Sequence, residues 1–409
     1  MKKVLILTVT AGNGHNSAAL ALKQKLESTG EVEVKVVDFV KEYTSKLNAW
    51  TIDKGYDLAV GYLRPIYDAF YEHYKRRDPK KENTCGAQAS LKKVNDDILK
   101  LIYDFQPDVV YGTTYYAGMA LTNLKRVYDL PCKTIVCMLD YVVSPFWEAN
   151  FKVDYLTLAH EDFRQELISE GFEDKQLYLT GIPVREQFFE VKSKQEAREE
   201  LGIEKDLFTV FILFGGGHWH GGHKILKSIV GSKIKEKMQI IIVNGRDEKP
   251  KKKIDKEIKK SPKNFVVKNY GFVKNIDVIM SASDVIVGKA GGLQSTESIV
   301  KGLPIICTEK IPGQEKYNIR FIESKGGAVT YRTKKQLLSH INRFLKNPDE
   351  LKKMSENLLK MRENGIQKTF ELIMAQPNAD YSNVLKKIDF GKVNKIVNRA
   401  RKNARKKNK

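Results

Sequence analysis

Short apolar runs alternate with amphipathic stretches along most of the chain. The first run, residues 3–10, is apolar and β-branched with little alternation, as in a strand that is covered on both faces. A glycine turn follows it, and Ala18, Leu22 and Leu26 then recur at helical spacing before Gly30. Further strands are predicted at residues 31–39, 107–112, 132–139, 154–159 and 176–181. Strands that alternate with helices in this way indicate a parallel sheet.

The same pattern starts again after residues 181–189, a stretch with Gly and Pro that we interpret as a linker. The strands expected in this second half are 208–214, 239–245, 264–272, 284–289 and 303–309. The sequence therefore predicts an α/β protein with two Rossmann-like, doubly wound parallel-sheet domains, at 1–182 and 183–370. In such sheets ligands bind at the carboxyl ends of the strands, so we expect the two domains to face a central cleft. Residues 371–409 are expected to form a helix that returns toward the first domain, followed by a basic tail.

One segment, residues 40–77, departs from this alternation. It holds six tyrosines and Trp50 and ends in Lys-Arg-Arg. Aromatic and basic residues on amphipathic helices are typical of segments that lie at a membrane interface. The alternative is an ordinary helical subdomain whose tyrosines pack in a core of their own, and the composition of the segment does not decide between the two.

The formal charge of +21 predicts an anionic partner, which can be nucleic acid, an anionic membrane or a phosphorylated substrate. Residues 381–409 alone contribute +10, and their apolar positions lie near helical spacing, so a short amphipathic helix that binds anionic lipid is expected there. A solvated tail is the alternative. We see no RNA-binding motif with interleaved aromatics, which argues against nucleic acid.

The cysteines and the apolar runs bear on the compartment. The four cysteines, Cys85, Cys132, Cys137 and Cys307, form no C-x-x-C pair, and we expect them to be buried thiols in a reducing compartment. The apolar runs are all shorter than the roughly 18 residues that cross a bilayer. The N-terminal MKKVLILTV lacks the cleavage pattern of a signal peptide, so we interpret it as the first strand of a cytoplasmic protein.

Residues 288–318 form the most specific motif. A strand enters Gly291 and Gly292, and a helix follows, whose free N–H groups and dipole favour an anion such as a phosphate. Glycines allow the phosphate to approach the backbone closely, and Lys289 adds a positive charge. One turn into the helix, Glu297 is placed to accept hydrogen bonds from a ribose diol.

The same motif continues, after the next strand, with PGQEKYN. Gln314, Glu315 and Asn318 offer several hydrogen-bonding groups there, as the hydroxyls of a sugar require. A lone Gly-Gly is more often only a tight turn. The combination of Gly-Gly, a glutamate one turn later and this polar segment indicates a nucleotide-sugar site.

A second glycine loop, FGGGHWHGGH at residues 214–223, joins a strand to a helix and is expected to line the diphosphate through Gly216, Gly217 and His218. A metal bound by its three histidines is the less favoured alternative, because a flexible glycine loop orients ligands poorly and no Cys or cluster of carboxylates lies beside it. We therefore expect no metal.

A third polar stretch, VNGRDEK at residues 243–249, ends another strand. Asn244, Gly245 and Arg246 could edge the pocket of a nucleotide base. A simple turn is the alternative for this stretch.

His15 lies at the first glycine turn, where strand becomes helix. A histidine titrates near neutral pH, so it can accept a proton in the cytoplasm. A ring that caps the edge of the sheet, or that contacts a phosphate, is an equally good interpretation of the position alone.

Together these residues resemble a known family. Gly12-x-Gly14-His15-x-x-x-Ala19, Gly181–Arg185, the second glycine loop and the block 288–318 resemble the GT-B glycosyltransferases of family 28. The resemblance is closest to the branch of the monogalactosyldiacylglycerol synthases and processive diacylglycerol glucosyltransferases. It covers roughly residues 3–370.

The resemblance implies an enzyme that moves a hexose from UDP-glucose or UDP-galactose to diacylglycerol, with inversion, at the inner face of the cell membrane, and without a cofactor or a metal. The residues it implies for the donor, beside those above, are Gly14, Leu293 and Gln294 toward the diphosphate and Phe272 and Val273 around the uracil. His15 is implied as the base.

The acceptor side departs from the family pattern. Related enzymes often carry a histidine shortly after Thr-Asp, whereas this chain has Leu139-Asp140 and no histidine before Trp147. Asp140 is retained and is expected to assist His15 or the acceptor. Other enzymes that share the architecture stay open as alternatives: a peptidoglycan-type transferase of N-acetylglucosamine to a lipid-linked precursor, and a UDP-sugar 2-epimerase.

Overall fold

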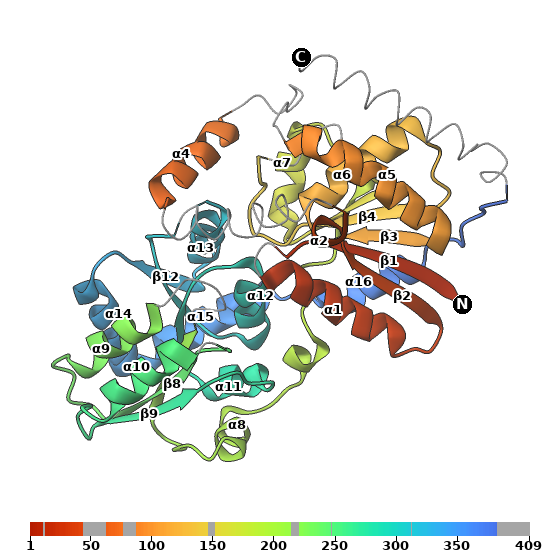
Figure 1. The fold of residues 1–409 in the computed structure, drawn as a ribbon. Helices are drawn as coiled ribbons and strands as arrows, with labels where there is room; N and C mark the ends of the chain where they lie inside the picture. Colours follow the sequence, from red (N-terminus) through yellow and green to blue (C-terminus); the bar gives the residue numbers. More distant parts are fainter. Residues whose placement is uncertain are drawn as a thin grey trace.

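The computed structural model describes residues 1–10, 13–43, 63–76, 87–145, 152–213, 221–246, 248–311 and 313–382. These residues form two α/β domains, each built on one parallel six-stranded sheet with helices packed against it (Figure 1). The predicted pair of doubly wound parallel-sheet domains is confirmed.

The N-terminal domain has the strand order β2-β1-β3-β4-β5-β6. Its strands are β1 (Lys2–Thr8), β2 (Val32–Asp38), β3 (Val109–Gly112), β4 (Lys133–Cys137), β5 (Tyr155–Leu158) and β6 (Leu177–Leu179). Its helices are α1 (Asn13–Glu27), α2 (Phe39–Tyr43), α4 (Arg64–Lys75), α5 (Ala87–Phe105), α6 (Tyr115–Val127) and α7 (Arg164–Ser169), with short 3-10 turns η1 (Glu161–Phe163), η2 (Asp174–Gln176) and η3 (Glu186–Phe189).

The C-terminal domain has the strand order β12-β11-β10-β7-β8-β9. Its strands are β7 (Phe208–Leu213), β8 (Met238–Val243), β9 (Phe265–Tyr270), β10 (Val285–Gly288), β11 (Ile305–Thr308) and β12 (Ala328–Tyr331). The helices of this half are α8 (Lys194–Glu200), α9 (Gly221–Val230), α10 (Glu248–Ile258), α11 (Ile276–Ala282), α12 (Gly292–Lys301), α13 (Gln314–Ser324), α14 (Lys334–Lys346), α15 (Pro348–Lys360) and α16 (Gly365–Met374).

In both sheets the strand order reverses at the first strand of the domain. β1 lies between β2 and β3, and β7 lies between β10 and β8. Loops that leave opposite sides of such a strand diverge, and this opens a crevice at its carboxyl end. The turn before His15 follows β1, and the block that starts at Lys289 follows β10, so the topology places the two most distinctive motifs at the two crevices.

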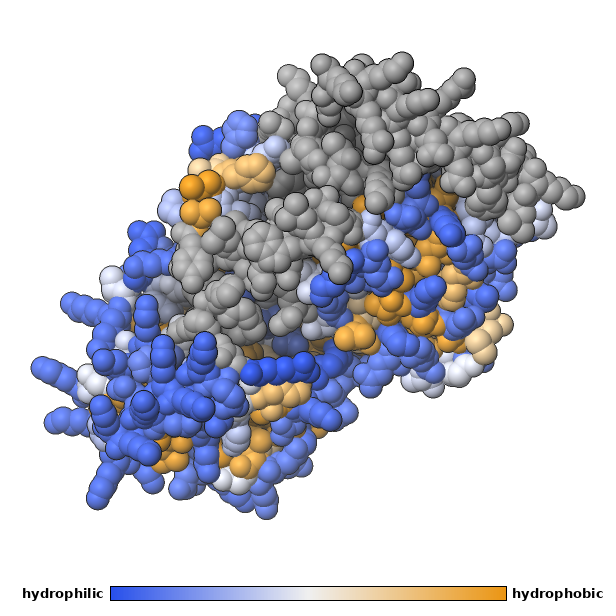
Figure 2. Space-filling view, in the orientation of Figure 1, coloured by the Kyte–Doolittle hydropathy of each residue, from blue (hydrophilic) through white to orange (hydrophobic). Residues whose placement is uncertain are grey.

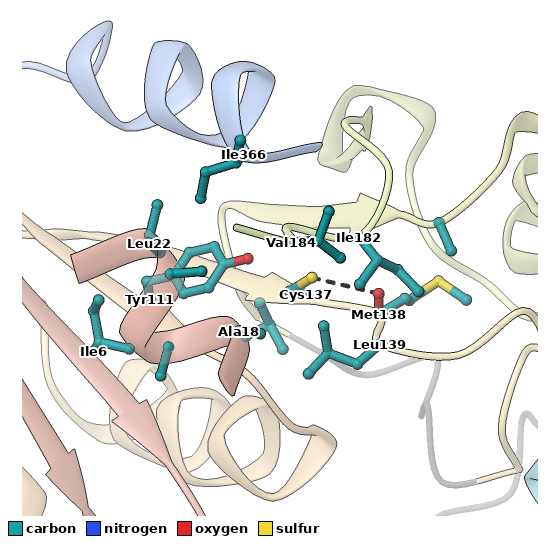
Figure 3. Close-up of a cluster of buried hydrophobic side chains, with 14 of the residues drawn as sticks. Ile6, Ala18, Leu22, Tyr111, Cys137, Met138, Leu139, Ile182, Val184 and Ile366 are labelled. Atoms are coloured by element: carbon teal, nitrogen blue, oxygen red, sulfur yellow. Dashed lines mark hydrogen bonds between the residues drawn. The ribbon is translucent and has the colours of Figure 1, made fainter. Parts of the chain in front are cut away.

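The core of the N-terminal domain explains why the middle of its first strand, residues 4–7, is apolar. Ile6 of β1 and Tyr111 of β3 are fully buried, and Ala18 and Leu22 of α1 cover them (Figure 3). Ile366 of α16 packs against the same cluster, although it comes from the far end of the chain. Burial of such side chains stabilises the fold by about 1.5–3 kcal/mol each, so α16 is an integral part of this domain.

The returning segment begins at Gly365, before the boundary expected at residue 371. After α16 the chain runs along the N-terminal domain, where Asp108 accepts a hydrogen bond from the Ala379 N–H at 2.7 Å. The Tyr381 hydroxyl donates to the carbonyl of Pro107 at 2.8 Å. The segment through Tyr381 is therefore attached to the N-terminal domain, and the basic tail from residue 383 lies outside the described residues.

The two connections between the domains run side by side. Gly181 has a φ of +81°, and a Cβ there would overlap the side chain of Glu363. A Cβ on Gly365 would overlap the carbonyl group of Ile182. Glycine is needed at both positions because the backbones cross at close range.

A fully buried amide joins the two domains. Asn318 of α13 donates to Asp140 Oδ1 at 2.7 Å and to the Ala290 carbonyl at 2.9 Å, and it accepts from the Tyr141 N–H at 2.7 Å. The Tyr141 ring also stacks on Phe321 of α13, with centroids 5.8 Å apart.

Two expectations about composition can be compared with the structure. Cys132, Cys137 and Cys307 are free, buried thiols, as predicted, whereas Cys85 lies outside the described residues. Over the part of the chain that the structure describes, the helices are too short or too polar to cross a membrane.

The close approach of the domains predicts different effects for two adjacent glycines. A Cβ on Gly292 would overlap the carbonyl oxygen of Leu139, whereas a Cβ on Gly291 would meet only Glu315 Oε1 at an ordinary 3.5 Å. Gly292→Ala is expected to lower Tm by about 1–4 °C, the effect of roughly 1–3 kcal/mol of overpacking in a protein of this size. Gly291→Ala is the matched control and is expected to melt like the wild type in differential scanning calorimetry. Equal losses in the two variants would contradict the close approach.

Candidate functional site

The residues expected to carry chemistry gather where the two sheets turn their carboxyl ends to each other. His15 lies at the start of α1, Asp140 follows β4, and Lys289 follows β10. α1 and α12 are in contact across the domain boundary (Figure 1). The helix whose first turn holds His15 is therefore a neighbour of the helix that carries Glu297, as the sequence motifs require.

A hydrogen bond fixes the tautomer of the His15 ring, and burial favours its neutral form. Its Nδ1 lies 2.5 Å from the carbonyl oxygen of Thr113, the residue that follows β3. A carbonyl can only accept, so Nδ1 carries the proton and Nε2 keeps its lone pair. Burial lowers the pKa of His15 below its ordinary value of 6.5, so the ring is neutral at pH 7. A neutral, oriented imidazole is suited to accept a proton and poorly suited to pair with a phosphate.

Polar side chains hold the turn that delivers His15. Thr8 donates to Asn16 at 3.0 Å, and Asn16 donates to Thr10 at 2.9 Å. Thr10 in turn donates to Asp38 at the end of β2. This chain of bonds ties the first turn of α1 to the ends of β1 and β2, so the direction of the imidazole follows from the fold.

Three ionisable residues meet at the boundary, Asp140 from the N-terminal domain and Lys289 and Glu315 from the C-terminal domain. Lys289 Nζ lies 3.2 Å from Glu315 Oε1, while Glu315 Oε2 is buried and has no hydrogen-bond partner among the described residues. Burial raises the pKa of Asp140 to about 7, and the charge of Glu315 adds to the shift. A buried acceptor without a partner requires a donor, and a sugar hydroxyl can supply one.

Glu297 has the environment expected for a carboxylate that binds a ligand. Its carboxyl group makes no hydrogen bond to a described residue, and burial raises its pKa to about 7. The charge of Asp277 adds to this shift, and the charge of Arg185, in the segment that connects the domains, opposes it. Two hydroxyl donors from a ribose would lower this penalty, because hydrogen bonds to a carboxylate favour its charged form.

Residues from both domains already contact the first turn of α12. Gly291 is its N-cap residue, and Gly292 packs against the carbonyl of Leu139. The Gln294 amide donates to the Leu213 carbonyl at 3.3 Å, at the end of β7. Leu293 is half-buried between them. A diphosphate at these residues stays a prediction, and the structure adds that Gln294 holds the strand from which the second glycine loop departs.

The residues expected around the base lie together at the ends of β8 and β9. The Arg246 guanidinium stacks over the Phe272 ring, with its carbon 5.0 Å from the centroid. Asn244 donates to Asn269 and to the Tyr270 carbonyl, and Gly245 turns with a φ of +65°. Val273 is half-buried beside the exposed ring of Phe272. This cluster is a flat aromatic and cationic surface of the kind that binds a base.

Five other residues expected at the site have different outcomes. Gly216, Gly217 and His218 lie outside the described residues. Gly14 lies in the first turn of α1, and a Cβ there would meet nothing within 4 Å, so the position has room beside it. Asn318 was expected to contact the sugar, but it is 0% exposed and both protons of its amide are bound by protein, so its visible task is to hold the domains together.

The sequence patterns did not reveal the contacts of α4. This helix is the described part of the aromatic insertion, and its residues Tyr67, Asp68, Tyr71, Glu72 and Lys75 face α13 of the other domain. The Tyr67 hydroxyl donates to Gln314 Oε1 at 3.0 Å, and Asp68 Oδ1 accepts from the Gly313 N–H at 2.9 Å. Tyr71 is 1% exposed and its ring lies 5.8 Å from that of Tyr317, so this tyrosine packs against the C-terminal domain.

Comparisons with known proteins agree with this geometry. The family model of the monogalactosyldiacylglycerol (MGDG) synthases matches residues 15–184, and that of the glycosyl transferases group 1 matches residues 193–361. The processive diacylglycerol beta-glucosyltransferase of Bacillus licheniformis is 26% identical over 361 residues, which are 87% of this chain and 90% of that protein. The enzyme of the same name from Bacillus subtilis is 25% identical over 362 residues, with the same coverage.

Solved structures show the same fold at lower identity. MurG of Acinetobacter baumannii superposes with a TM-score of 0.63 at 15% identity, over 91% of this chain and 99% of that one. A putative UDP-N-acetylglucosamine 2-epimerase from Listeria monocytogenes gives 0.56 at 17% identity, over 91% and 95%. Anabaena Alr3699/HepE in complex with UDP-glucose gives 0.51 at 12% identity, over 91% and 98%. These likenesses establish the two-domain GT-B fold.

The pKa of Glu297 predicts a stability effect that depends on pH. Since the folded state holds the proton more tightly than the unfolded state, stability falls as pH rises from the ordinary 4.5 to about 7. Glu297→Gln removes this loss, so its Tm should exceed that of the wild type by about 3–4 °C at roughly pH 8, the effect of roughly 3 kcal/mol in a protein of this size, and the difference should shrink toward pH 5. Calorimetry at both pH values measures it.

The control for this measurement is Glu356→Gln, at an exposed position of α15, which should leave Tm unchanged at both pH values. A Glu297→Gln variant that is less stable than the wild type at pH 8 would show that the carboxylate is satisfied in the folded protein.

Proposed function

This chain belongs to the GT-B glycosyltransferases, in the branch of the monogalactosyldiacylglycerol synthases and processive diacylglycerol glucosyltransferases, and on that premise we propose that it transfers a hexose from a UDP-sugar to diacylglycerol. The observation that carries the proposal is the neutral His15 imidazole, whose Nε2 is left to accept a proton next to the donor half of the protein. Glucose and galactose are both candidates for the sugar.

The proposed reaction is a single displacement. His15 Nε2 takes the proton of the diacylglycerol hydroxyl, and the hydroxyl oxygen attacks the anomeric carbon of the sugar. The bond from that carbon to the diphosphate oxygen breaks, and UDP leaves with its electrons. One displacement inverts the anomeric centre, so an α-linked donor gives a β-linked glycolipid.

The residues of the C-terminal domain bind the donor and stabilise the leaving group in this proposal. The N-terminus of α12 supplies backbone N–H groups and the positive end of its dipole, and Lys289 adds a full charge. In this proposal these groups stabilise the negative charge that develops on the leaving UDP, and a divalent metal is not required for that task. Glu297 binds the ribose, and Glu315 Oε2 accepts from a hydroxyl of the sugar.

We further propose that the protein attaches peripherally to the inner face of the cell membrane through anionic lipids. The outward face of α4 exposes Leu63, Ile66 and Phe70 at helical spacing, with exposed fractions of 43%, 65% and 44%, and Figure 2 shows an apolar patch at this place. Apolar side chains on a surface helix that ends in Lys75 and Arg76 fit a headgroup region.

Labelled UDP-glucose and UDP-galactose, each incubated with vesicles that contain diacylglycerol, test the activity. We expect one labelled glycolipid series on lipid chromatography, with a β linkage by NMR. His15→Ala should lower kcat by about 100-fold or more while the Kd for UDP stays unchanged, since the base does not contact the nucleotide. His340→Ala, on α14, is the control.

The result that would refute the proposal is the absence of labelled lipid with both donors. Undiminished turnover by His15→Ala would instead refute the role of His15 as the base, while the proposed glycosyltransferase activity would still stand.

Flotation with phosphatidylglycerol vesicles tests the attachment. Removal of residues 383–409, which spares the packed Tyr381, should weaken binding by about tenfold or more, because each cation near an anionic leaflet contributes ~1 kcal/mol. Ile66→Ser with Phe70→Ser should weaken it as well, whereas Val191→Ser, at a 95% exposed position elsewhere, should not. Equal flotation of all variants would contradict the proposed roles of the basic tail and of the outward face of α4 in membrane attachment.

A further inference from the structure

α4 is supplied by the N-terminal domain but contacts the segment of the C-terminal domain that is expected to bind the sugar. Its inward face binds residues 313–317, the turn before α13 and the first turn of that helix. Tyr67 and Asp68 contact Gln314 and Gly313, and one turn later Glu72 Oε1 accepts from the Tyr317 hydroxyl at 2.6 Å and from Lys316 at 3.1 Å. In Figure 1, α4 stands directly above α13.

The contacts of Tyr67 fix the geometry of Gln314. Burial raises the pKa of Tyr67, with a contribution from the charge of Asp140, so its hydroxyl stays protonated and donates. It donates to the carbonyl oxygen of the Gln314 side chain, and this orients the NH₂ group of that amide away from the tyrosine. An amide held in this way can donate to a sugar hydroxyl without the loss of rotamer freedom that a loose side chain incurs on binding.

The backbone beside Gln314 is fixed by the same helix. Gly313 has a φ of +64°, which favours glycine, and a Cβ there would overlap the Tyr67 ring. Asp68 accepts from the Gly313 N–H. The sugar-binding end of α13 is therefore packed against and hydrogen-bonded to α4, while Glu72 and Tyr71 keep α4 attached independently of the Tyr67 hydroxyl.

We propose that Tyr67 is a positioning residue for the donor sugar, which acts through Gln314, so that the acceptor domain takes part in the choice of donor. This inference rests on the proposed function, because it takes Gln314 as a contact of the transferred hexose. The tyrosine itself need not touch the sugar. Its hydroxyl sets the orientation of the group that does.

Binding measurements separate this role from a structural one. UDP carries no hexose, so Tyr67→Phe should leave its Kd unchanged in isothermal titration calorimetry. The Kd for the UDP-hexose that the wild type prefers should rise about three- to tenfold, the effect of one hydrogen bond. The ratio of the two constants for UDP-glucose and UDP-galactose should also approach one. Tyr178→Phe, at an exposed position of β6, is the matched control.

A double-mutant cycle shows whether Tyr67 acts through Gln314. In a Gln314→Ala background, Tyr67→Phe should have no further effect on the Kd for the UDP-hexose, because the group it orients is gone. Additive losses in the double variant would overturn the inference, and so would equal losses for UDP and UDP-hexose, or no loss at all. A wild type that binds UDP-hexose no better than an unrelated nucleotide would overturn the proposed function itself, and with it this inference.

Discussion

The buried amide of Asn318 is the contact on which the arrangement of this protein depends. It lies in the C-terminal domain, yet two of its three hydrogen bonds go to Asp140 and Tyr141 of the N-terminal domain. Removing one partner of a buried hydrogen bond leaves the other unsatisfied, at a cost of about 1–3 kcal/mol. The two sheets are therefore held with their carboxyl ends toward each other, and α1, which carries His15, contacts α12 of the other domain.

Around this satisfied contact the protein keeps two carboxylates that lack hydrogen-bond donors. Glu297 has no hydrogen bond from a described residue, and Glu315 Oε2 has no partner among them. Asp140 accepts from Asn318, but burial and the charge of Glu315 still raise its pKa. Such groups destabilise the protein by itself and are stabilised by a ligand that brings hydroxyl donors. The loss of stability at the site is offset elsewhere, as in the fully buried strand β8 and the buried residues 4–8 of β1.

The sequence was informative where local chemistry determines the structure. The middle of a strand such as β1, where it is buried on both faces, must be apolar, and a turn that presents helix N–H groups needs glycine, so both domains and the glycine motifs could be predicted. The contacts of Asn318 and Tyr67 could not, because their partners lie 177–178 and 247 residues away and no local pattern records which partner a polar side chain will find. For the same reason the return of α16 was expected too late: Ile366 is one apolar residue among many until the N-terminal core is known.

The position of α4 has a consequence for how such proteins can be recombined. Enzymes built from two similar halves invite the construction of chimeras in which one half is taken to carry nucleotide-sugar preference and the other lipid preference. Here a cut at Gly181 would carry Gln314 into the hybrid and leave its phenolic partner behind. A chimera that keeps these contacts must therefore take the C-terminal half and α4 from the same parent protein.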